Sequence, residues 1–474
     1  MRFRPIAGVW VGVLCASLLA PAEARAHGHL VRSRPARGDT LRVAPRLLRL
    51  EFSETPELSM SRVRLVDSLR REIGLLPVHA DGDSTRVLIA DIVGHLAAGR
   101  YTVLWQIAGR DGHPVHGEFA FVVVEDSAAA HGAAAGPAPI IAQSPSSPAM
   151  GPMQHPVPSE THLVVGFDSE ALPYVFSRWA QFVGLLVVIG AVAFRFLVLE
   201  RAPREQLAPA VVADATARAV RLAALGAMVL TLSAAARLMA QWTALHVDTA
   251  AESAMPLGRV LWLSLWGHAW LVQVAALIVL AVGLLLARRA GREPLGWGIA
   301  ALAAVVLACT PAFSGHAAAS GTATPVIIDA LHVLAAGGWM GTLLVVLAAG
   351  LPATRSLVPP ARGRAMAALV NTFSGVALAC AAVVVVTGLL ASLRNVETLS
   401  ALARSAYGNM LLRKLFFLAV AAVIGLYNWR RARLALAASG DDTAIRRAMQ
   451  AELAAGVAIL LITAFLVAIP LPPT

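Results

Sequence analysis

The stretch LPYVFSRWAQFVGLLVVIGAVAFRFLVL, residues 172–199, is mostly apolar and long enough to cross a bilayer, which takes about 20 residues. Seven more such segments follow it, with approximate bounds 217–241, 262–287, 294–313, 325–350, 366–392, 410–430 and 449–470. The composition agrees, because 58% of the residues are hydrophobic and only 14% are charged, whereas soluble domains are about a quarter charged. The sequence therefore predicts an all-α polytopic membrane bundle of about eight helices.

The arginines of this region lie in alternate loops. The loops that follow the first, third, fifth and seventh segments carry most of them, whereas the intervening loops 243–257 and 314–324 carry none. Only the stretch Arg394–Lys414 is ambiguous. The arginines concerned are Arg201, Arg204, Arg288, Arg289, Arg292, Arg355, Arg362, Arg364, Arg430, Arg431, Arg433, Arg446 and Arg447. Positively charged loops stay on the cytoplasmic side, so we expect the chain to enter the first segment from outside and to end outside. This placement also accounts for the net charge of +11 without a nucleic-acid partner.

The first residues are typical of a secretory signal peptide. Arg2 and Arg4 precede an apolar run over 6–20, and Ala24-Arg25-Ala26 has the small-x-small pattern of a cleavage site. We therefore expect residues 1–26 to be removed, with His27 at the new amino terminus. Export agrees with the topology. It places the residues before the first span in the periplasm, and the spans then lie in a bacterial inner membrane.

Residues 27–125 are expected to form a soluble β domain. Short, partly alternating β-rich runs occur at 46–54, 62–67, 86–92, 100–107 and 117–124, separated by Gly- and Asp-containing turns. Several strands at this spacing favour a small sandwich or barrel. Residues 126–165 are rich in Ala, Gly, Pro and Ser and read as a disordered linker. Residues 166–474 then form the membrane domain.

The expected amino terminus and one loop of the β domain carry candidate metal ligands. An amino-terminal His27 would offer an amine and an imidazole nitrogen, which together suit Cu(II). The loop Asp111-Gly112-His113-Pro114-Val115-His116 could add an imidazole from His113 and an oxygen or a supporting hydrogen bond from Asp111. His29 and His116 are further candidates, since residues 27–29 could wrap Cu(II) alone. The alternative is that these are ordinary exposed loop histidines.

Three runs in this domain resemble the CopC family of periplasmic copper-binding proteins. They are HGHLVRSRP at 27–35, Phe52-Ser53-Glu54, and DGHPVHG at 111–117. The resemblance implies an Ig-like or cupredoxin-like β-sandwich that binds Cu(II) through His27, Asp111 and His113. Some members also hold a Met-rich Cu(I) site, but this domain contains only Met60, which favours a version that binds Cu(II) alone.

The membrane segments resemble the CopD family of copper-resistance membrane proteins. The runs that carry the resemblance are FSGH at 313–316, DALH at 329–332, GWMG at 338–341, FSG at 373–375, Tyr407-Gly408 and Lys414. The resemblance implies a role in copper import across the inner membrane. Together the two resemblances cover nearly all of the chain after the signal peptide.

Ionisable residues within the spans are costly and therefore predict function. Asp329 and His332 are three positions apart and share a helix face in the outer half of the fifth segment. His316 lies at the outer end of the fourth segment, and His268 in the outer part of the third is a further candidate. We expect this group to receive copper, as Cu(I) or Cu(II). The alternative is hydrogen bonding between helices.

These observations favour a copper-homeostasis and resistance protein that captures Cu(II) in the periplasm and passes copper inward. No P-loop is evident, so transport would be passive or ion-coupled. We expect no enzyme activity. One alternative is a membrane oxidoreductase that uses haem or reduces copper, and another is a membrane-anchored copper store or sensor. The expected partners are copper ions, the lipid bilayer and other periplasmic copper proteins, and the sequence leaves the oligomeric state open.

Overall fold

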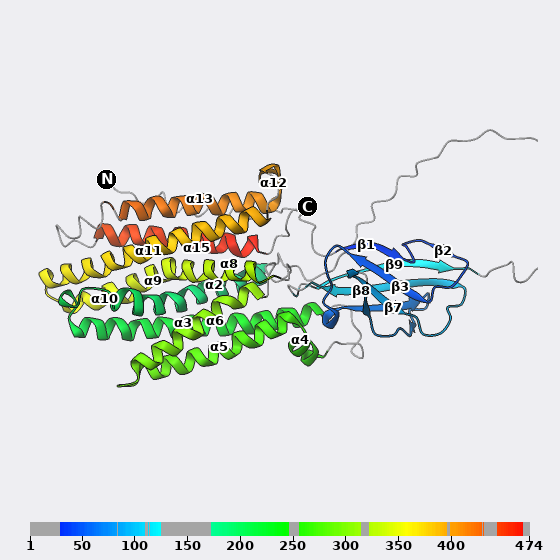
Figure 1. Cartoon of the computed structure of the whole chain (residues 1–474), viewed down its shortest axis with the longest axis horizontal. Coiled ribbons are helices and arrows are strands. Elements are labelled where there is room, and N and C mark those ends of the chain that lie inside the picture. Colours follow the sequence, from blue (N-terminus) through cyan, green and yellow to red (C-terminus); the bar gives the residue numbers. More distant parts are fainter. Residues whose placement is uncertain are drawn as a thin grey trace, which may run out of the picture. The chain divides into compact units, whose positions relative to one another are not determined.

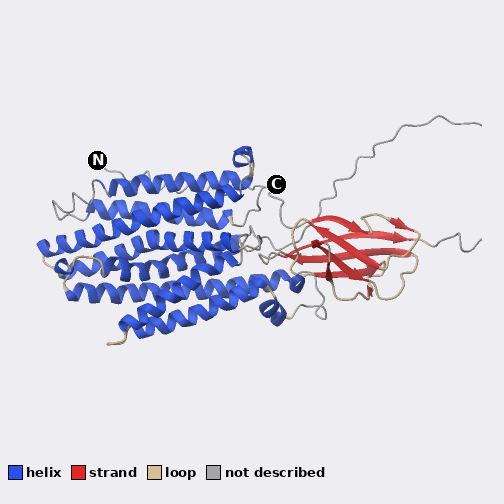
Figure 2. Cartoon of the chain, in the orientation of Figure 1, coloured by secondary structure: helices blue, strands red, loops and turns tan. Residues whose placement is uncertain are grey.

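The computed structural model describes residues 29–82, 84–109, 112, 114–124, 172–245, 256–313, 322–395, 399–428, 430 and 443–467. The chain divides into two compact units, one built of strands and one of helices (Figure 2). The expected signal peptide and the expected linker lie outside the described residues, so the predicted domain boundaries stay predictions.

The β unit is a sandwich of two sheets (Figure 1). One sheet has the order β1 (Leu30–Arg34), β3 (Leu47–Phe52), β7 (Ser84–Asp91) and β6 (His79–Asp81). The other has the order β2 (Thr40–Leu41), β9 (Pro114–Val123), β8 (Gly99–Ala108), β4 (Arg62–Asp67) and β5 (Glu72–Ile73). Within the second sheet only β2 and β9 pair in parallel. The sandwich prediction is confirmed.

Side-chain alternation explains how the two sheets pack. In β3 the side chains of Leu48, Leu50 and Phe52 are buried, whereas those between them are partly exposed. Such alternation gives a strand one apolar face. From the facing sheet, Trp105 of β8 meets Phe52 edge to face, with ring centroids 5.2 Å apart. Burial of both inner faces forms the core of this unit.

Among the residues that the structure describes, eight helices are long and apolar enough to cross a membrane, so that prediction is confirmed and the chain is a multi-pass membrane protein. The spans are α2 (Leu172–Ala193) with η3 (Phe194–Leu199), α3 (Pro209–Leu245), α5 (Leu265–Ala287), α6 (Glu293–Phe313), a composite fifth span, α11 (Pro359–Asn395), α13 (Ala406–Tyr427) and α15 (Thr443–Leu466). The fifth span comprises α8 (Ala323–Ala336), η6 (Gly337–Gly341), α9 (Thr342–Val345), η7 (Val346–Gly350), α10 (Leu351–Ala353) and η8 (Thr354–Ser356). Shorter elements are η1 (Leu58–Met60), η4 (Arg204–Gln206), α4 (Leu257–Leu263) and α12 (Leu399–Arg404).

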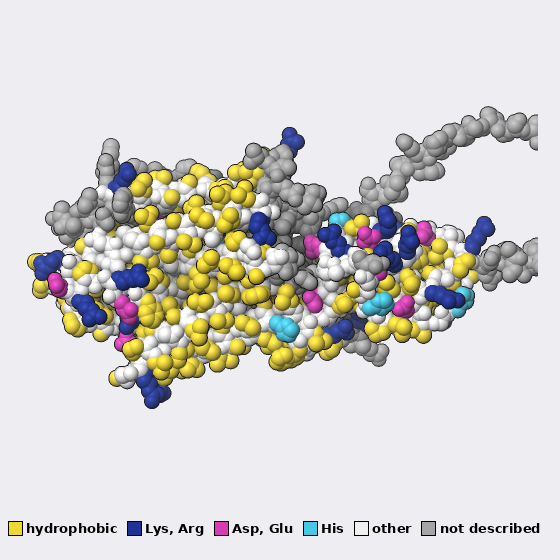
Figure 3. Space-filling view, in the orientation of Figure 1, with side chains coloured by type: hydrophobic (Ala, Val, Ile, Leu, Met, Phe, Trp, Pro, Cys, Tyr) yellow, Lys and Arg dark blue, Asp and Glu magenta, His cyan; other side chains and the backbone are white. Residues whose placement is uncertain are grey.

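Two of the Arg-rich turns meet at one end of this unit. Arg195 of η3 forms ion pairs with Glu200, which follows the first span, and with Glu293, which begins α6. The turns after the first and third spans are therefore neighbours. Figure 3 shows Lys and Arg side chains gathered at this end of the helices and a largely hydrophobic surface along their middle. This distribution fits the predicted topology, which stays a prediction.

The fifth span is held against α2 by a contact between glycines. A Cβ atom on Gly190 of α2 would collide with the main chain of Gly341 in η6, and one on Gly341 would collide with the carbonyl of Leu186. Small residues at helix interfaces let backbones approach closely. This contact fixes the middle of the fifth span, whose outer part is α8.

Candidate metal centres

The chain that follows His27 is tied to one end of the sandwich. The His29 main-chain N–H donates to Oγ of Ser53, 3.0 Å away, and the Ser53 N–H donates to the His29 carbonyl at the same distance. Ser53 directly follows β3. The chain at His29 is therefore anchored at the carboxyl end of β3, and His27 lies outside the described residues.

The hairpin between β8 and β9 lies at the same end. Ala108, the last residue of β8, pairs with Pro114, the first of β9. The Ala108 carbonyl accepts a hydrogen bond of 2.8 Å from the N–H of Glu57, which lies four residues beyond Ser53. The carboxyl end of β8 therefore lies beside the segment that leaves β3. Neither Asp111 nor His113 is among the described residues.

The structure also places the remaining candidate ligands of the sandwich. His29 is exposed next to β1, and His116 lies within β9, partly buried and paired with Gln106 of β8. Met60 is fully buried, with 0% of its surface exposed. A sulfur in the core does not face a surface metal site, so this methionine gives no support to a second, soft-ligand site.

In the helical unit, Asp329 and His332 lie on α8 one turn apart, as the sequence predicts. Nδ1 of His332 is 2.9 Å from Oγ1 of Thr387 on α11. The Thr387 hydroxyl is itself 2.6 Å from the carbonyl oxygen of Val383. Because a carbonyl cannot donate, the single hydroxyl hydrogen must lie in that short contact. The Thr387 oxygen therefore accepts from an Nδ1–H of His332, and the ring also hydrogen-bonds to the main chain of Val384 in the same helix.

This hydrogen bond determines which nitrogen of His332 can bind a ligand. In a neutral imidazole with its proton on Nδ1, Nε2 carries the free lone pair. Metal-binding histidines in proteins are commonly oriented in this way, with the other nitrogen donating to a fixed acceptor. The ring lies against α11, because a Cβ atom on Gly388 would be 3.5 Å from Cε1 of His332. His332 is therefore preorganised as a ligand through Nε2.

Asp329 is partly buried and lies among cations. The side chains of Lys414 on α13 and Arg394 on α11 are close enough to interact electrostatically with its carboxylate, and Lys414 also acts on His332. Burial of the carboxylate opposes its charged form, and the two cations offset part of that cost. The arrangement joins α8, α11 and α13 around the outer half of the fifth span.

The structure does not bring His268 into this group. His268 is exposed near the start of α5, and its Nε2 donates to the carbonyl of Trp262 at 2.9 Å. α5 packs mainly on α6, α3 and α4. Among the residues the structure describes, no three His, Cys, Asp or Glu side chains lie close enough to hold a metal ion. His316 lies outside the described residues, so its place near His332 stays a prediction.

Two buried polar groups lie elsewhere in the bundle, and the sequence reasoning missed the second of them. Arg237 on α3 is 6% exposed and donates to Oε1 of Gln181 at 3.0 Å. Glu452 on α15 is 4% exposed and accepts from Trp339 and Asn428. Each is an ionisable residue inside a predicted span, the signal that led to Asp329 and His332. Glu452 was not considered because the candidate copper ligands were sought only in the outer half of the bundle.

Comparison with known proteins shows which families the two units resemble. Residues 30–124 match the CopC domain, 169–325 match the N-terminal domain of copper resistance protein D-like proteins, and 367–466 match copper resistance protein D. The chain is similar to the copper transport protein CutJ of Bacillus subtilis (strain 168), with 25% identity over 480 residues that cover 98% of this chain and 78% of that protein.

Two further similarities concern the β unit. Copper resistance protein C of Pseudomonas syringae pv. tomato is 30% identical over 119 residues, which cover 24% of this chain and 94% of that protein. The crystal structure of CopC from Methylosinus trichosporium OB3b aligns at 29% identity over 21% of this chain and 96% of that one, with a TM-score of 0.20. By the family matches over 30–124, 169–325 and 367–466, the chain belongs to the CopC and CopD copper-resistance families, which it joins in one multi-pass membrane protein of copper homeostasis.

Proposed function

We propose that this protein captures Cu(II) at one end of its periplasmic sandwich and passes copper into the helical bundle for import across the inner membrane. The observation that carries the first step is the pair of main-chain links at that end. Ser53 holds the segment that follows His27, and Glu57 holds the last residue of β8. Two separate parts of the sequence are thereby brought to one place.

The ligand set at this place suits Cu(II). If the signal peptide is cut after Ala26, His27 supplies an amine and an imidazole nitrogen, His113 a second imidazole and Asp111 an oxygen. Nitrogen and oxygen ligands in a tetragonal arrangement are what Cu(II) prefers. The side chain of Met60 is fully buried, so its sulfur is not available as a soft ligand at the surface. His29 and His116 remain as additional candidates at or near this end.

Copper then reaches the outer half of the bundle. His332 presents Nε2, Asp329 a carboxylate one turn away, and His316 is the predicted third ligand from the adjacent loop. Residues 126–165 would act as a flexible tether. A tether raises the effective concentration of the copper-loaded sandwich near the bundle without any new contact.

The predicted orientation places the sandwich and the carboxyl terminus in the periplasm, and the Arg-rich turns in the cytoplasm. The pairing of Arg195 with Glu200 and Glu293 supports a common side for two of those turns. We regard the protein as a transporter rather than an enzyme. Periplasmic copper proteins are the partners that would load the sandwich.

Copper uptake by cells tests this function. Cells that express the intact chain at matched levels should accumulate more cytoplasmic copper than cells without it. His27→Ala and His113→Ala should lower uptake at limiting copper, and His332→Ala should abolish it while Cu(II) binding at the sandwich persists. His95→Ala, an exposed histidine of the sandwich, is the control. Unchanged cytoplasmic copper in every strain would reject import, and a Soret band in the purified protein would favour the haem oxidoreductase.

A further inference from the structure

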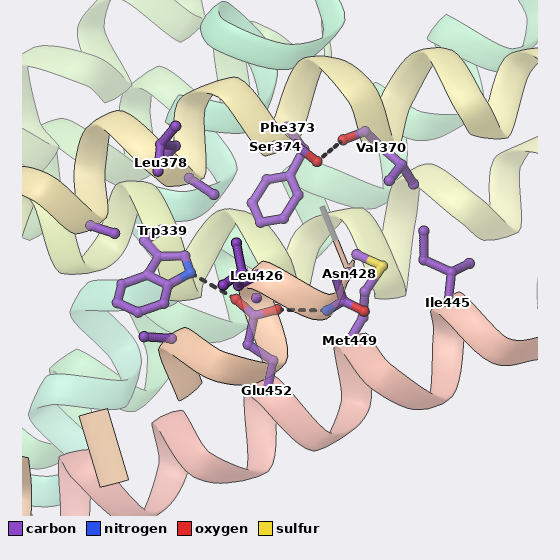
Figure 4. Close-up of a pocket in the computed structure, with 14 residues that line it drawn as sticks. Trp339, Val370, Phe373, Ser374, Leu378, Leu426, Asn428, Ile445, Met449 and Glu452 are labelled. Carbon is purple, nitrogen blue, oxygen red and sulfur yellow. Dashed lines mark hydrogen bonds between the residues drawn. The ribbon is translucent and has the colours of Figure 1, made fainter. Parts of the chain in front are cut away.

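A cavity of about 320 Å³ lies between α11, α13, α15 and η6 (Figure 4). Most of its lining is aliphatic or aromatic, from residues such as Phe373, Leu378, Leu426, Ile445 and Met449. The polar side chains in the lining are those of Trp339, Ser374, Asn428 and Glu452. The cavity is therefore a mostly apolar space with one carboxyl group in its wall.

The carboxyl group of Glu452 is held by two donors. Oε1 accepts from Nε1 of Trp339 and Oε2 accepts from Nδ2 of Asn428, each at 2.9 Å. Figure 4 shows the two bonds approaching the carboxyl group from opposite sides. Trp339 belongs to η6 and Asn428 follows α13 directly. The group is thus fixed in place by two other spans.

No cation pairs with Glu452 in the part of the chain that the structure describes. Several cations lie on α15 itself and on the spans that pack on it or line the cavity. They are Arg178 on α2, Arg362, Arg364 and Arg394 on α11, Arg413 and Lys414 on α13, and Arg446 and Arg447 on α15. Among the described residues none of these cations forms an ion pair with Glu452, and the side chains that hydrogen-bond to its carboxyl are those of Trp339 and Asn428. An uncompensated carboxylate inside a membrane bundle costs several kcal/mol. Something must therefore neutralise this group.

A proton suits the site better than a metal ion. The nearby oxygens are Oδ1 of Asn428, which is buried without a partner among the described groups, and Oγ of Ser374, which donates to the Val370 carbonyl at 2.8 Å. Hard cations take about six oxygen ligands, and this lining does not supply them. The only sulfur in the lining is that of Met449, one soft ligand. The Asn428 amide can present either its NH₂ or its oxygen, so it fits both the ionised and the protonated carboxyl.

The cavity also extends along α15 toward one end of the bundle. Ile445, Met449 and Glu452 lie on one face of α15 and all line the cavity. At 1.5 Å per residue, Glu452 lies about 10 Å along the helix from Ile445. Ile445 is in the first turn of α15, which begins at Thr443. In the predicted topology that end of α15 is cytoplasmic, so the cavity extends from the cytoplasmic end toward the carboxyl.

We infer that Glu452 binds a proton inside the bundle, exchanges it with the cytoplasm, and releases it when a copper ion enters the bundle. The O–H bond of the carboxylic acid breaks, the proton leaves to water on the cytoplasmic side, and the carboxylate gains one negative charge that offsets one positive charge of copper. Trp339 links the two events, because it binds Glu452 and lies seven residues after His332 in the same span. The coupling to copper rests on the proposed function, whereas protonation of Glu452 does not.

Infrared spectroscopy of the full chain in lipid nanodiscs tests the proton site directly. At neutral pH the intact protein should show the carbonyl stretch of a buried carboxylic acid, shifted in D₂O. Glu452→Gln should remove this band, and Glu205→Gln, an exposed carboxylate, should retain it. An intact protein without the band, or an undiminished band in Glu452→Gln, would overturn the inference. Trp339→Phe is a second variant, which should shift the band without removing it because one donor is lost.

Copper addition in the same experiment tests the coupling. Loading the intact protein with copper should reduce the Glu452 band and release protons into a weakly buffered medium. His332→Ala should abolish both responses while keeping the band itself. A band that copper leaves unchanged in a protein that imports copper would overturn the coupling. One outcome separates the two proposals. If the intact chain does not import copper, but its carboxylic-acid band is lost in Glu452→Gln, the proposed function fails and the proton site stands.

Discussion

Replacing Thr387 by Val tests whether the preorganisation of His332 matters for transport. Valine has nearly the shape of threonine but lacks the hydroxyl that accepts from Nδ1 of His332 at 2.9 Å. The site is 5% exposed, so water cannot easily replace that acceptor. Leaving a buried donor unsatisfied costs about 1–3 kcal/mol. The imidazole is then no longer held with its proton on Nδ1 and its lone pair on Nε2.

The expected loss of transport follows from this cost. Since 1.4 kcal/mol corresponds to a factor of ten, the change amounts to about 5–150-fold. Substitution of the groups that orient metal-binding histidines typically costs about 10–100-fold, which falls in the same range. We expect the initial rate of copper uptake in Thr387→Val to drop by about that factor, with protein levels unchanged.

Two variants control this experiment. Thr387→Ser keeps a hydroxyl and should retain most of the uptake. Thr372→Val removes a hydroxyl from the same helix, α11, that bonds only to the Ala368 carbonyl at 2.9 Å, and should leave uptake unchanged. Uptake by Thr387→Val at the level of the intact chain, in cells where His332→Ala is inactive, would refute the argument from the tautomer.

Three further predictions concern stability. Gly190→Ala should destabilise the bundle by about 1–3 kcal/mol through overpacking, because its Cβ would collide with the main chain of η6. In the control Gly375→Ala, the new Cβ meets nothing within 4 Å, so the bundle should keep its stability. Thermal unfolding in detergent compares the two variants. Phe52→Ala should lower the free energy of unfolding of the sandwich by about 3–5 kcal/mol, since Phe52 is 1% exposed, and a calorimetric transition that does not move would contradict this. Hydrogen bonds to the Ala80 carbonyl and the Asp91 carboxylate raise the pKa of His79. Its stabilising contribution should be present below about pH 6.5 and be lost as the pH rises through the raised pKa; melting curves at several pH values should show this dependence weaken in Asp91→Asn.

The spans and the sandwich were predictable because their signals are local. An apolar run of sufficient length decides a membrane helix, and alternation such as that of Leu48, Leu50 and Phe52 decides a strand with one buried face. The i, i+3 spacing of Asp329 and His332 likewise sufficed to place both on one face of α8. These features depend on neighbours in the sequence alone.

The partners of the buried polar groups were not predictable in this way. Thr387 lies 55 residues from His332, and Trp339 lies 113 residues from Glu452. No periodic pattern distinguishes these residues from others in apolar helices. His268 is a similar case. The sequence predicts how deep this residue lies in the third span, but it does not predict which neighbouring helix its side chain faces. Only the packing of spans settles such pairs.

The most direct test of the account is copper transport by the purified chain in proteoliposomes that contain a copper-sensing dye. With the sandwich facing outward and copper supplied outside in either oxidation state, lumenal copper should rise above that in protein-free vesicles. His332→Ala should abolish the rise without preventing Cu(II) binding by the sandwich, and His113→Ala should slow it at limiting copper. No rise in lumenal copper with the intact chain, in either oxidation state, would contradict the account.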